Sequence, residues 1–176
     1  MIFKFQEKTP HLGDHVFLAE GTHVIGDVQI GDESSVWYNT VIRGDLAPIS
    51  IGKRCNIQDL SMLHVNQGQP LRIEDEVTVG HSVVLHGCTI KNGSLIGMGS
   101  IIMNGAVIEE ETLVAAGSLV TENKTFPPRV MIMGSPAKVI RELTPQEIKS
   151  LHETALRYSQ KAVEHSENLQ LSQDLT

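Results

Sequence analysis

The chain has 176 residues, of which 40% are hydrophobic and 20% charged, and its 21 acidic against 14 basic side chains give a formal net charge of −7. This composition is typical of one soluble globular domain; it argues against a disordered chain and, without a basic stripe, against a nucleic-acid partner. No stretch approaches the 18 apolar residues of a membrane span. Aromatic residues make up only 4%, so small and branched side chains must fill the core.

The first residues and the cysteines indicate the compartment. The sequence starts Met1-Ile2-Phe3-Lys4 without an apolar secretory segment, which predicts a cytoplasmic protein. Two cysteines, Cys55 and Cys88, are too few for a disulfide framework. We expect both thiols to be buried rather than reactive.

A six-residue repeat organises most of the chain. An amphipathic helix cannot keep a strict period of six, because 3.6 residues per turn would carry its apolar stripe around the surface. A stack of hairpins would show turn signals that are absent here. Most of the repeat aliphatic residues are followed, four positions later, by a small residue. The longest uninterrupted run is Ile90, Ile96, Ile102, Ile108, Val114 and Val120.

This spacing predicts a mainly β fold, a parallel β-helix with three short strands per coil. The aliphatic and small residues both point into a narrow triangular prism, which leaves no room for aromatic rings. The phase slips after Ile42, after Leu63 and before Ile90, which indicates two inserted loops and one shortened corner.

The repeat ends after Val120. We expect Thr125-Phe126-Pro127-Pro128 to form a turn that cannot continue the ladder. A Thr cap at Thr144, Pro at the next position and Glu147 three residues beyond the cap predict a helix start. The predicted division is a β-helix domain over 1–124, a connecting loop over 125–143, a C-terminal helix packed on the prism over 144–166, and a polar tail over 167–176.

Two histidines are predicted to be neighbours on one side of the prism. Arg43, His64 and His86 each follow an inward aliphatic residue on successive coils, and neighbouring strands lie about 4.8 Å apart. The 22 residues from His64 to His86 make one coil of 18 plus a four-residue insertion. Two such imidazoles can both reach a metal with bonds of about 2.0–2.1 Å.

A third histidine, His81, belongs to the preceding side. It shares its column with Asp59 and is not expected to meet His64 and His86 within one chain. If three prisms pack about a threefold axis, His81 of one chain faces the other two of its neighbour, and Arg43 faces Asp59. Three histidines with an open fourth position are typical of a catalytic zinc site.

These motifs resemble those of the gamma-class carbonic anhydrases over about residues 10–165. The resemblance implies a left-handed β-helix and a homotrimer with zinc, iron or cobalt between subunits, held by His64 and His86 of one and His81 of the next. It also implies a lyase that hydrates carbon dioxide reversibly through a metal-bound hydroxide. The matching segments are Arg43-Gly44-Asp45, Asn56-Ile57-Gln58-Asp59, His64, Gly80-His81 and His86-Gly87-Cys88.

The same resemblance gives roles to other polar side chains. Gln58 would hydrogen-bond the metal-bound water, and Asn56 would help to place the substrate. Arg43 and Asp59 would bridge two subunits, with Asp45 supporting Arg43. Tyr158 would lie near the mouth of the site.

One loop departs from the family pattern. Fully active members have an acidic loop with a glutamate shuttle after the first histidine, but residues 65–72 contain no carboxylate or histidine. Slow hydration is therefore expected, because the released proton needs a route to bulk water. Glu74 and Glu76 lie just beyond this loop, and their column positions do not predict that they reach the metal.

Other functions use the same prism. Gly134-Ser135-Pro136-Ala137-Lys138 resembles the loop that follows the repeat of coenzyme A-dependent acyltransferases, which typically use one histidine as general base. A metal-dependent thioesterase and a non-catalytic trimeric scaffold are further alternatives. The remaining histidines match neither column and are predicted to be surface residues: His11, His15, His23, His152 and His165.

Overall fold

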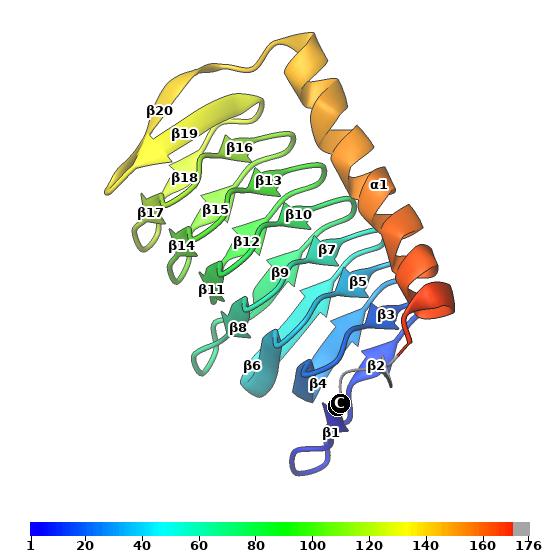
Figure 1. Ribbon diagram of the computed structural model, residues 1–176. Coiled ribbons are helices and arrows are strands. Elements are labelled where there is room, and N and C mark those ends of the chain that lie inside the picture. The colour runs from blue at the N-terminus through cyan, green and yellow to red at the C-terminus, as the bar shows by residue number, and fades with distance from the viewer. Residues whose placement is uncertain (171–176) are drawn as a thin grey trace, which may run out of the picture.

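The structure is a computed structural model that describes residues 1–170. Parallel coils stack into a β-solenoid of about seven turns, and a single long helix lies along its side (Figure 1). The predicted parallel β-helix is confirmed. Within the described residues, no helix has the length and apolar character that crossing a membrane requires.

The strands are short because each side of a coil is only one hexapeptide long. They are β1 (Ile2–Phe3), β2 (His11–Leu12), β3 (Phe17–Leu18), β4 (His23–Ile30), β5 (Ser35–Val36), β6 (Val41–Ile51), β7 (Asn56–Ile57), β8 (Met62–His64), β9 (Leu71–Ile73), β10 (Thr78–Val79), β11 (Val84–His86), β12 (Thr89–Ile90), β13 (Leu95–Ile96), β14 (Ile101–Ile102), β15 (Val107–Ile108), β16 (Leu113–Val114), β17 (Leu119–Val120), β18 (Thr125–Phe126), β19 (Val130–Gly134) and β20 (Ala137–Glu142). The helix α1 is Pro145–Asn168.

Three ladders form the faces of the prism. The first face consists of β8, β11, β14 and β17 together with the start of β6, and the second face of β9, β12, β15 and β18 with the end of β6. Long β6 therefore turns the edge between these two faces. The third face is the 8-stranded sheet that runs from β3 to β20. In Figure 1 the first face lies at the left and α1 at the right.

The core is the interior of the prism. The inward aliphatic residues pair in register from coil to coil, as Ile42 with Leu63 and Leu63 with Leu85, and these three side chains are fully buried. Buried hydroxyls in the small-residue columns donate to backbone carbonyls at coil corners; Ser61 Oγ, for example, donates to the Gly80 carbonyl at 3.0 Å. This hydrogen bond removes the cost of burying a polar group, which is why serine is accepted in the core.

One inward position differs from the predicted pattern. Thr89 lies four positions after Leu85, where the repeat predicts an inward small residue, but Thr89 is half-buried and Cys88 is 1% exposed. The shortened corner before Ile90 shifts the inward position by one residue. Burial raises the pKa of the Cys88 thiol to about 12, so the thiol stays protonated at neutral pH and is not a reactive nucleophile.

The prediction of a connecting loop over 125–143 is wrong, because this segment contains the strands β18, β19 and β20. Thr125 and Phe126 continue the second face, pairing with β15, and the Val107 amide donates to the Lys124 carbonyl at 2.8 Å. The prolines follow β18, where their missing N–H groups interrupt no ladder. β19 continues the third face, and β20 folds back antiparallel to it, closing the end of the stack.

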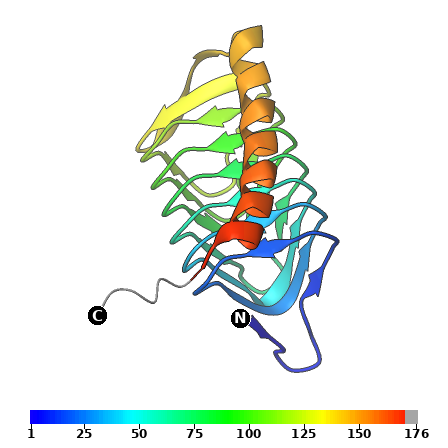
Figure 2. The same cartoon turned by 45° about the vertical axis from the view of Figure 1, so that its right-hand side comes forward.

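The C-terminal helix begins as its cap predicts and covers the third face. Thr144 and Glu147 form a reciprocal capping box, and Leu151, Ala155 and Ala162 are buried. The helix contacts β3, β5, β7 and β10, and Figure 2 shows it running along the side of the stack. It ends at Asn168, two residues beyond the predicted end, and the last six residues of the predicted tail lie outside the described residues.

Two histidines predicted to be surface residues instead fasten α1 to the prism. His152 Nδ1 lies 2.8 Å from Glu76 Oε2 and its Nε2 lies 3.2 Å from Glu111 Oε1. The His165 ring lies 4.9 Å from the Trp37 ring in an edge-on arrangement. The prediction for these two residues was wrong, because it used only positions in the repeat, and the repeat does not describe contacts between α1 and the prism.

His152 makes the attachment of α1 dependent on pH. Burial lowers the pKa of this imidazole, but its hydrogen bonds to Glu76 and Glu111 and their charges outweigh burial and raise the pKa above its ordinary 6.5. A raised folded-state pKa gives stabilisation that is complete below the unfolded value and is lost as the pH rises through the folded value.

We therefore expect His152→Gln to lower the free energy of unfolding by roughly 1–2 kcal/mol under mildly acidic conditions, the scale of charge-assisted hydrogen bonds. The difference from wild type should shrink as the pH rises. Urea denaturation between about pH 5 and pH 9 measures this, within the range where histidine titrates. His11→Gln, at an exposed position, is the control, and a difference for His152→Gln that did not change with pH would contradict the prediction.

Candidate metal centre

His64 and His86 lie side by side on the first face. They are a register pair at the ends of β8 and β11. His64 Nδ1 is 3.1 Å from His86 Nε2, and the ring centroids are 5.0 Å apart at an interplanar angle of 72°. The structure thus brings two of the three predicted ligands together within one chain.

The opposite nitrogen of each ring meets a hydrogen-bond acceptor. His64 Nε2 lies 2.9 Å from Asp45 Oδ1, and His86 Nδ1 lies 2.7 Å from Asn104 Oδ1. A carboxylate and an amide oxygen only accept, so these ring nitrogens carry the protons. In two neutral rings the remaining nitrogens, His64 Nδ1 and His86 Nε2, then present their lone pairs to the same space, an arrangement that suits a shared cation.

The residues inserted after Ile42, within β6, place Asp45 next to His64, on the side away from His86. Asp45 accepts a hydrogen bond from Arg43 as well as from His64. Burial raises the pKa of Asp45, but the hydrogen bonds from His64 and Arg43 outweigh it and the net shift is downward. Asp45 therefore stays ionised at neutral pH and holds His64 by a charged contact.

His81 lies apart from the other two histidines. It follows β10 on the third face, where its Nδ1 is 2.7 Å from Asp59 Oδ2, and its side chain is 45% exposed. Over residues 1–170, no cluster of three or more His, Cys, Asp or Glu side chains is arranged to hold a metal. A single chain thus presents the histidine pair at one place and His81 at another.

The predicted intersubunit pair has other partners within the chain. Arg43 pairs with Asp45, and Asp59 pairs with His81. The Arg43 side chain is 42% exposed and the Asp59 side chain 31% exposed, so both can be reached from outside the chain. Their bridging role remains a prediction.

Asn56 and Gln58 form a buried chain of amides on β7 and the corner that follows it. Gln58 Nε2 donates to Asn56 Oδ1 at 3.0 Å, and Asn56 Nδ2 donates to Thr78 Oγ1 at 2.8 Å. Gln58 is 6% exposed. In this arrangement one N–H of the Gln58 amide is engaged by Asn56, and the second N–H and the carbonyl oxygen are left to meet a ligand.

Tyr158 lies on α1 against the third face. Its ring is 5.6 Å from the Trp37 ring in an edge-on contact. Burial and the negative charge of Asp59 raise the pKa of Tyr158, so its hydroxyl stays protonated at neutral pH. The structure therefore associates Tyr158 with the Asp59 and His81 part of the chain, and not with His64 and His86.

Asn104 and Glu122 were missed by the sequence reasoning. Asn104 Nδ2 donates to Glu122 Oε1 at 3.1 Å, while Asn104 Oδ1 faces His86. Both residues stand two positions after an inward aliphatic residue of the first face, Ile102 and Val120. Extending the column analysis to that second position would have placed them one above the other, next to the histidine column.

The two glutamates beyond the inserted loop do not serve the histidine pair. Glu74 pairs with Lys91 at 2.8 Å, and Glu76 is shared by Arg54 and His152. The loop itself is closed by a bridge between Asn66 and Gln69. Both carboxylates are thus occupied elsewhere on the prism.

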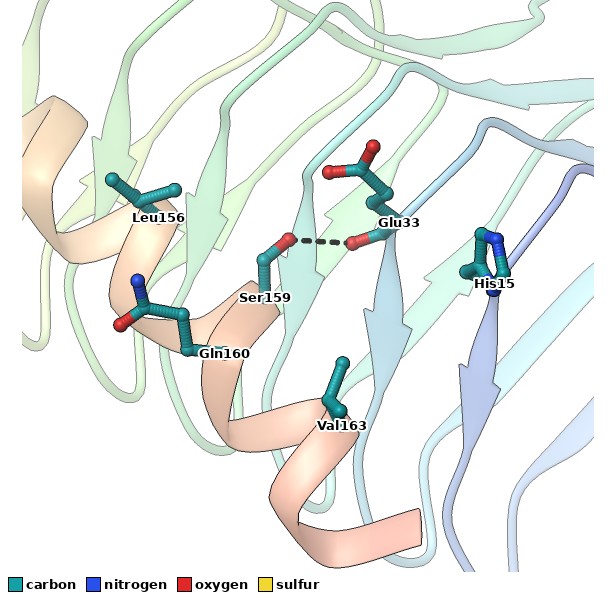
Figure 3. Close-up of a pocket in the computed structure, with 6 residues that line it drawn as sticks. All are labelled: His15, Glu33, Leu156, Ser159, Gln160 and Val163. Carbon is teal, nitrogen blue, oxygen red and sulfur yellow. Dashed lines mark hydrogen bonds between the residues drawn. The ribbon is translucent and has the colours of Figure 1, made fainter. Parts of the chain in front are cut away.

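A separate pocket lies between α1 and the first coils (Figure 3). It has a volume of about 310 Å³, and the Ser159 hydroxyl donates to the Glu33 carbonyl at 2.8 Å beside it. None of the predicted site residues lines this pocket. Its lining residues are His15, Glu33, Leu156, Ser159, Gln160 and Val163.

Comparison with known proteins identifies the family. Residues 9–44 match the family model "Bacterial transferase hexapeptide (six repeats)". A carbonic anhydrase of Geobacillus kaustophilus is 48% identical over 161 residues, 92% of this chain and 88% of that protein. "Gamma carbonic anhydrase 1, mitochondrial" of Arabidopsis thaliana is 42% identical, over 91% of this chain and 60% of that protein. The chain belongs to the gamma-class carbonic anhydrase family.

Members and neighbours of this family carry more than one functional name. A crystal structure described as a putative acetyltransferase of Bacillus cereus has a TM-score of 0.93 and 46% identity, and the match covers 96% of this chain and 98% of that one. Family membership, shown by the gamma-class relatives, indicates an enzyme.

Proposed function

We propose that the protein is a metal-dependent carbonic anhydrase that hydrates carbon dioxide reversibly at sites between the subunits of a homotrimer. Each site would use His64 and His86 of one subunit and His81 of the next. The observation that carries this proposal is the convergence of His64 Nδ1 and His86 Nε2 at 3.1 Å, with the opposite nitrogens held by Asp45 and Asn104. Zinc, iron and cobalt all accept such imidazole ligands.

The surface beside the histidine pair supports self-association. Met62, Val84 and Ile101 occupy one outward column of the first face, and the side chains of Met62 and Ile101 are 46% and 42% exposed. Exposed apolar side chains in a row are typical of an interface. A second copy is the occupant we propose, because a three-histidine site needs His81 from another chain. Repeating that one contact around a threefold axis closes a trimer.

The chain's own residues would prepare the site for hydration. When bound, a divalent metal with neutral imidazole ligands lowers the pKa of its water from 15.7 to about 7. Asp45 and Asn104 hold the protons of the two histidines away from the metal position. Gln58, held by Asn56, would orient the reacting water through the free groups of its side-chain amide.

Proton release is expected to limit the rate. The inserted loop lacks a carboxylate, and Glu74 and Glu76 are engaged in ion pairs. External buffer must then take the proton that an internal shuttle would carry, because general-base transfer needs an acceptor within hydrogen-bond reach.

We therefore expect anaerobically purified protein to contain stoichiometric metal and to catalyse hydration at a rate that rises with buffer concentration. Elemental analysis and stopped-flow hydration on the same sample measure both quantities. The comparison is made with protein reloaded with zinc and with iron. Hydration at the uncatalysed rate in both metal forms would refute the proposed reaction.

Coenzyme A-dependent acyl transfer is the second candidate, favoured by the description of the similar Bacillus cereus structure as a putative acetyltransferase. In this chain the Gly134–Lys138 segment joins β19 to β20 at the end of the stack. The histidine pair lies on other strands, β8 and β11, so this loop and the pair are separate features. Saturable coenzyme A binding by metal-free protein would favour acyl transfer, whereas metal-dependent hydration without such binding would favour the lyase.

A further inference from the structure

We propose that Asn104 and Glu122 are positioning residues that hold His86 with its Nε2 lone pair directed at the metal position. The inference deepens the proposed function and rests on it. His86 Nδ1 donates to Asn104 Oδ1 at 2.7 Å, and Asn104 Nδ2 donates to Glu122 Oε1 at 3.1 Å. These contacts form a directed chain from the imidazole to a carboxylate.

Glu122 sets the direction of this chain. An amide side chain can turn either its oxygen or its nitrogen toward a histidine, and the two choices favour opposite ring tautomers. An ionised carboxylate only accepts, so Glu122 requires the amide nitrogen of Asn104 to face it. The amide oxygen then faces His86, which places the imidazole proton on Nδ1 and leaves Nε2 free to bind.

The backbone at Gly87 makes room for Asn104. A Cβ atom added to Gly87 would lie 2.6 Å from Asn104 Oδ1, and Gly87 adopts a φ of +53°. The Gly105 amide donates to the Gly87 carbonyl at 2.8 Å, which holds the coil of Asn104 against that of His86. The absence of a side chain at position 87 therefore lets the amide approach the imidazole closely.

The same principle applies to all three predicted ligands. His64 is backed directly by Asp45 and His81 directly by Asp59, whereas His86 reaches its carboxylate through the amide of Asn104. A carboxylate behind each imidazole raises its basicity and fixes its orientation, and loss of such a partner typically lowers metal affinity about 10–100-fold. Asn104 and Glu122 supply this support for the third ring.

The two main variants of the test keep the net charge constant. Asn104→Leu removes the acceptor with little change in volume. The double variant Asn104→Asp with Glu122→Gln keeps an acceptor toward His86 and reverses the second hydrogen bond, because the glutamine amide donates to the new carboxylate. Asn66→Leu, at an exposed position in the inserted loop, is the matched control.

Zinc affinity is measured by competition with a chromophoric chelator, and the visible spectrum of the cobalt-loaded protein reports the ligand geometry. We expect Asn104→Leu to weaken zinc binding about 10–100-fold and to alter the cobalt spectrum. The double variant should return both to the wild-type range, which a merely structural role of Asn104 would not predict. Glu122→Leu, at an exposed position, should weaken binding less and tests the chain if Asn104→Leu does not fold.

The outcomes separate this inference from the proposed function. Wild-type zinc affinity and an unchanged cobalt spectrum in folded Asn104→Leu would overturn the positioning role while leaving the metal site in place. Failure of the double variant to recover binding would also overturn it. Metal binding with the expected ranking but without hydration would support the positioning role and refute the lyase.

Discussion

His81→Ala is expected to bring the metal content to background and hydration to the uncatalysed rate, while the β-helix stays folded. The side chain of His81 is 45% exposed and contacts Asp59, so its loss leaves no cavity in the core. Two histidines of one chain then remain for each metal, too few for the three-ligand centre of a catalytic zinc site. Elemental analysis after dialysis and circular dichroism measure the two properties. Full metal occupancy in this variant would contradict the assignment of His81 as a ligand.

A mixing experiment tests whether the ligands come from different chains. His81→Ala keeps the histidine pair, and His64→Ala keeps His81, so neither homotrimer has a complete site. A site is complete only where a His81→Ala chain supplies the histidine pair and the neighbouring chain, carrying His64→Ala, supplies His81. In trimers reassembled at random from equal amounts, about one quarter of the sites meet this condition, because each cyclic interface is heterologous. Metal binding and hydration should recover to that fraction. No recovery in mixtures shown to contain both chains would refute a shared site.

The second large effect is expected from charges on the first face. Met62→Glu combined with Ile101→Glu should convert the proposed trimer to monomers and abolish metal binding, although all three histidines are intact. Each carboxylate would be buried without a partner in the proposed interface, which opposes association strongly. Light scattering gives the mass, and elemental analysis gives the metal content of the same sample.

The control for this result is Leu156→Glu. Leu156 is 53% exposed on α1, which covers a different face, so the same change there should leave mass and metal unchanged. A double variant that remained trimeric would place the interface elsewhere. A monomer that still bound zinc stoichiometrically would show that one chain suffices for the site.

Much of the fold was predictable because one rule repeats. A triangular coil has room for one aliphatic and one small residue per side, so the spacing of Ile42, Leu63 and Leu85 sets the register without knowledge of any other contact. That register also predicted that His64 would lie next to His86. The helix start was predictable from the local hydrogen bonds of Thr144 and Glu147.

The errors arose where the repeat rule no longer applied. The prolines at 127 and 128 were expected to end the ladder, but they follow β18, and the carbonyl of Lys124 accepts from the coil below. Thr89 was predicted to face inward because the regular spacing was continued through the shortened corner before Ile90, where the inward position falls one residue earlier, at Cys88. Contacts of His152 depend on how α1 lies on the prism, and no period within the repeat describes that.

By itself, the sequence determined most of the inward-facing side chains and which histidines share a column, because a period of six leaves an uninterrupted coil only one way to close. Only the tertiary structure decided which nitrogen of each histidine faces its neighbour and which carries the proton. That choice depends on acceptors contributed by other segments, Asp45 from the residues inserted after Ile42 and Asn104 from the next coil. The side-chain orientations of these acceptors depend in turn on Arg43 and Glu122.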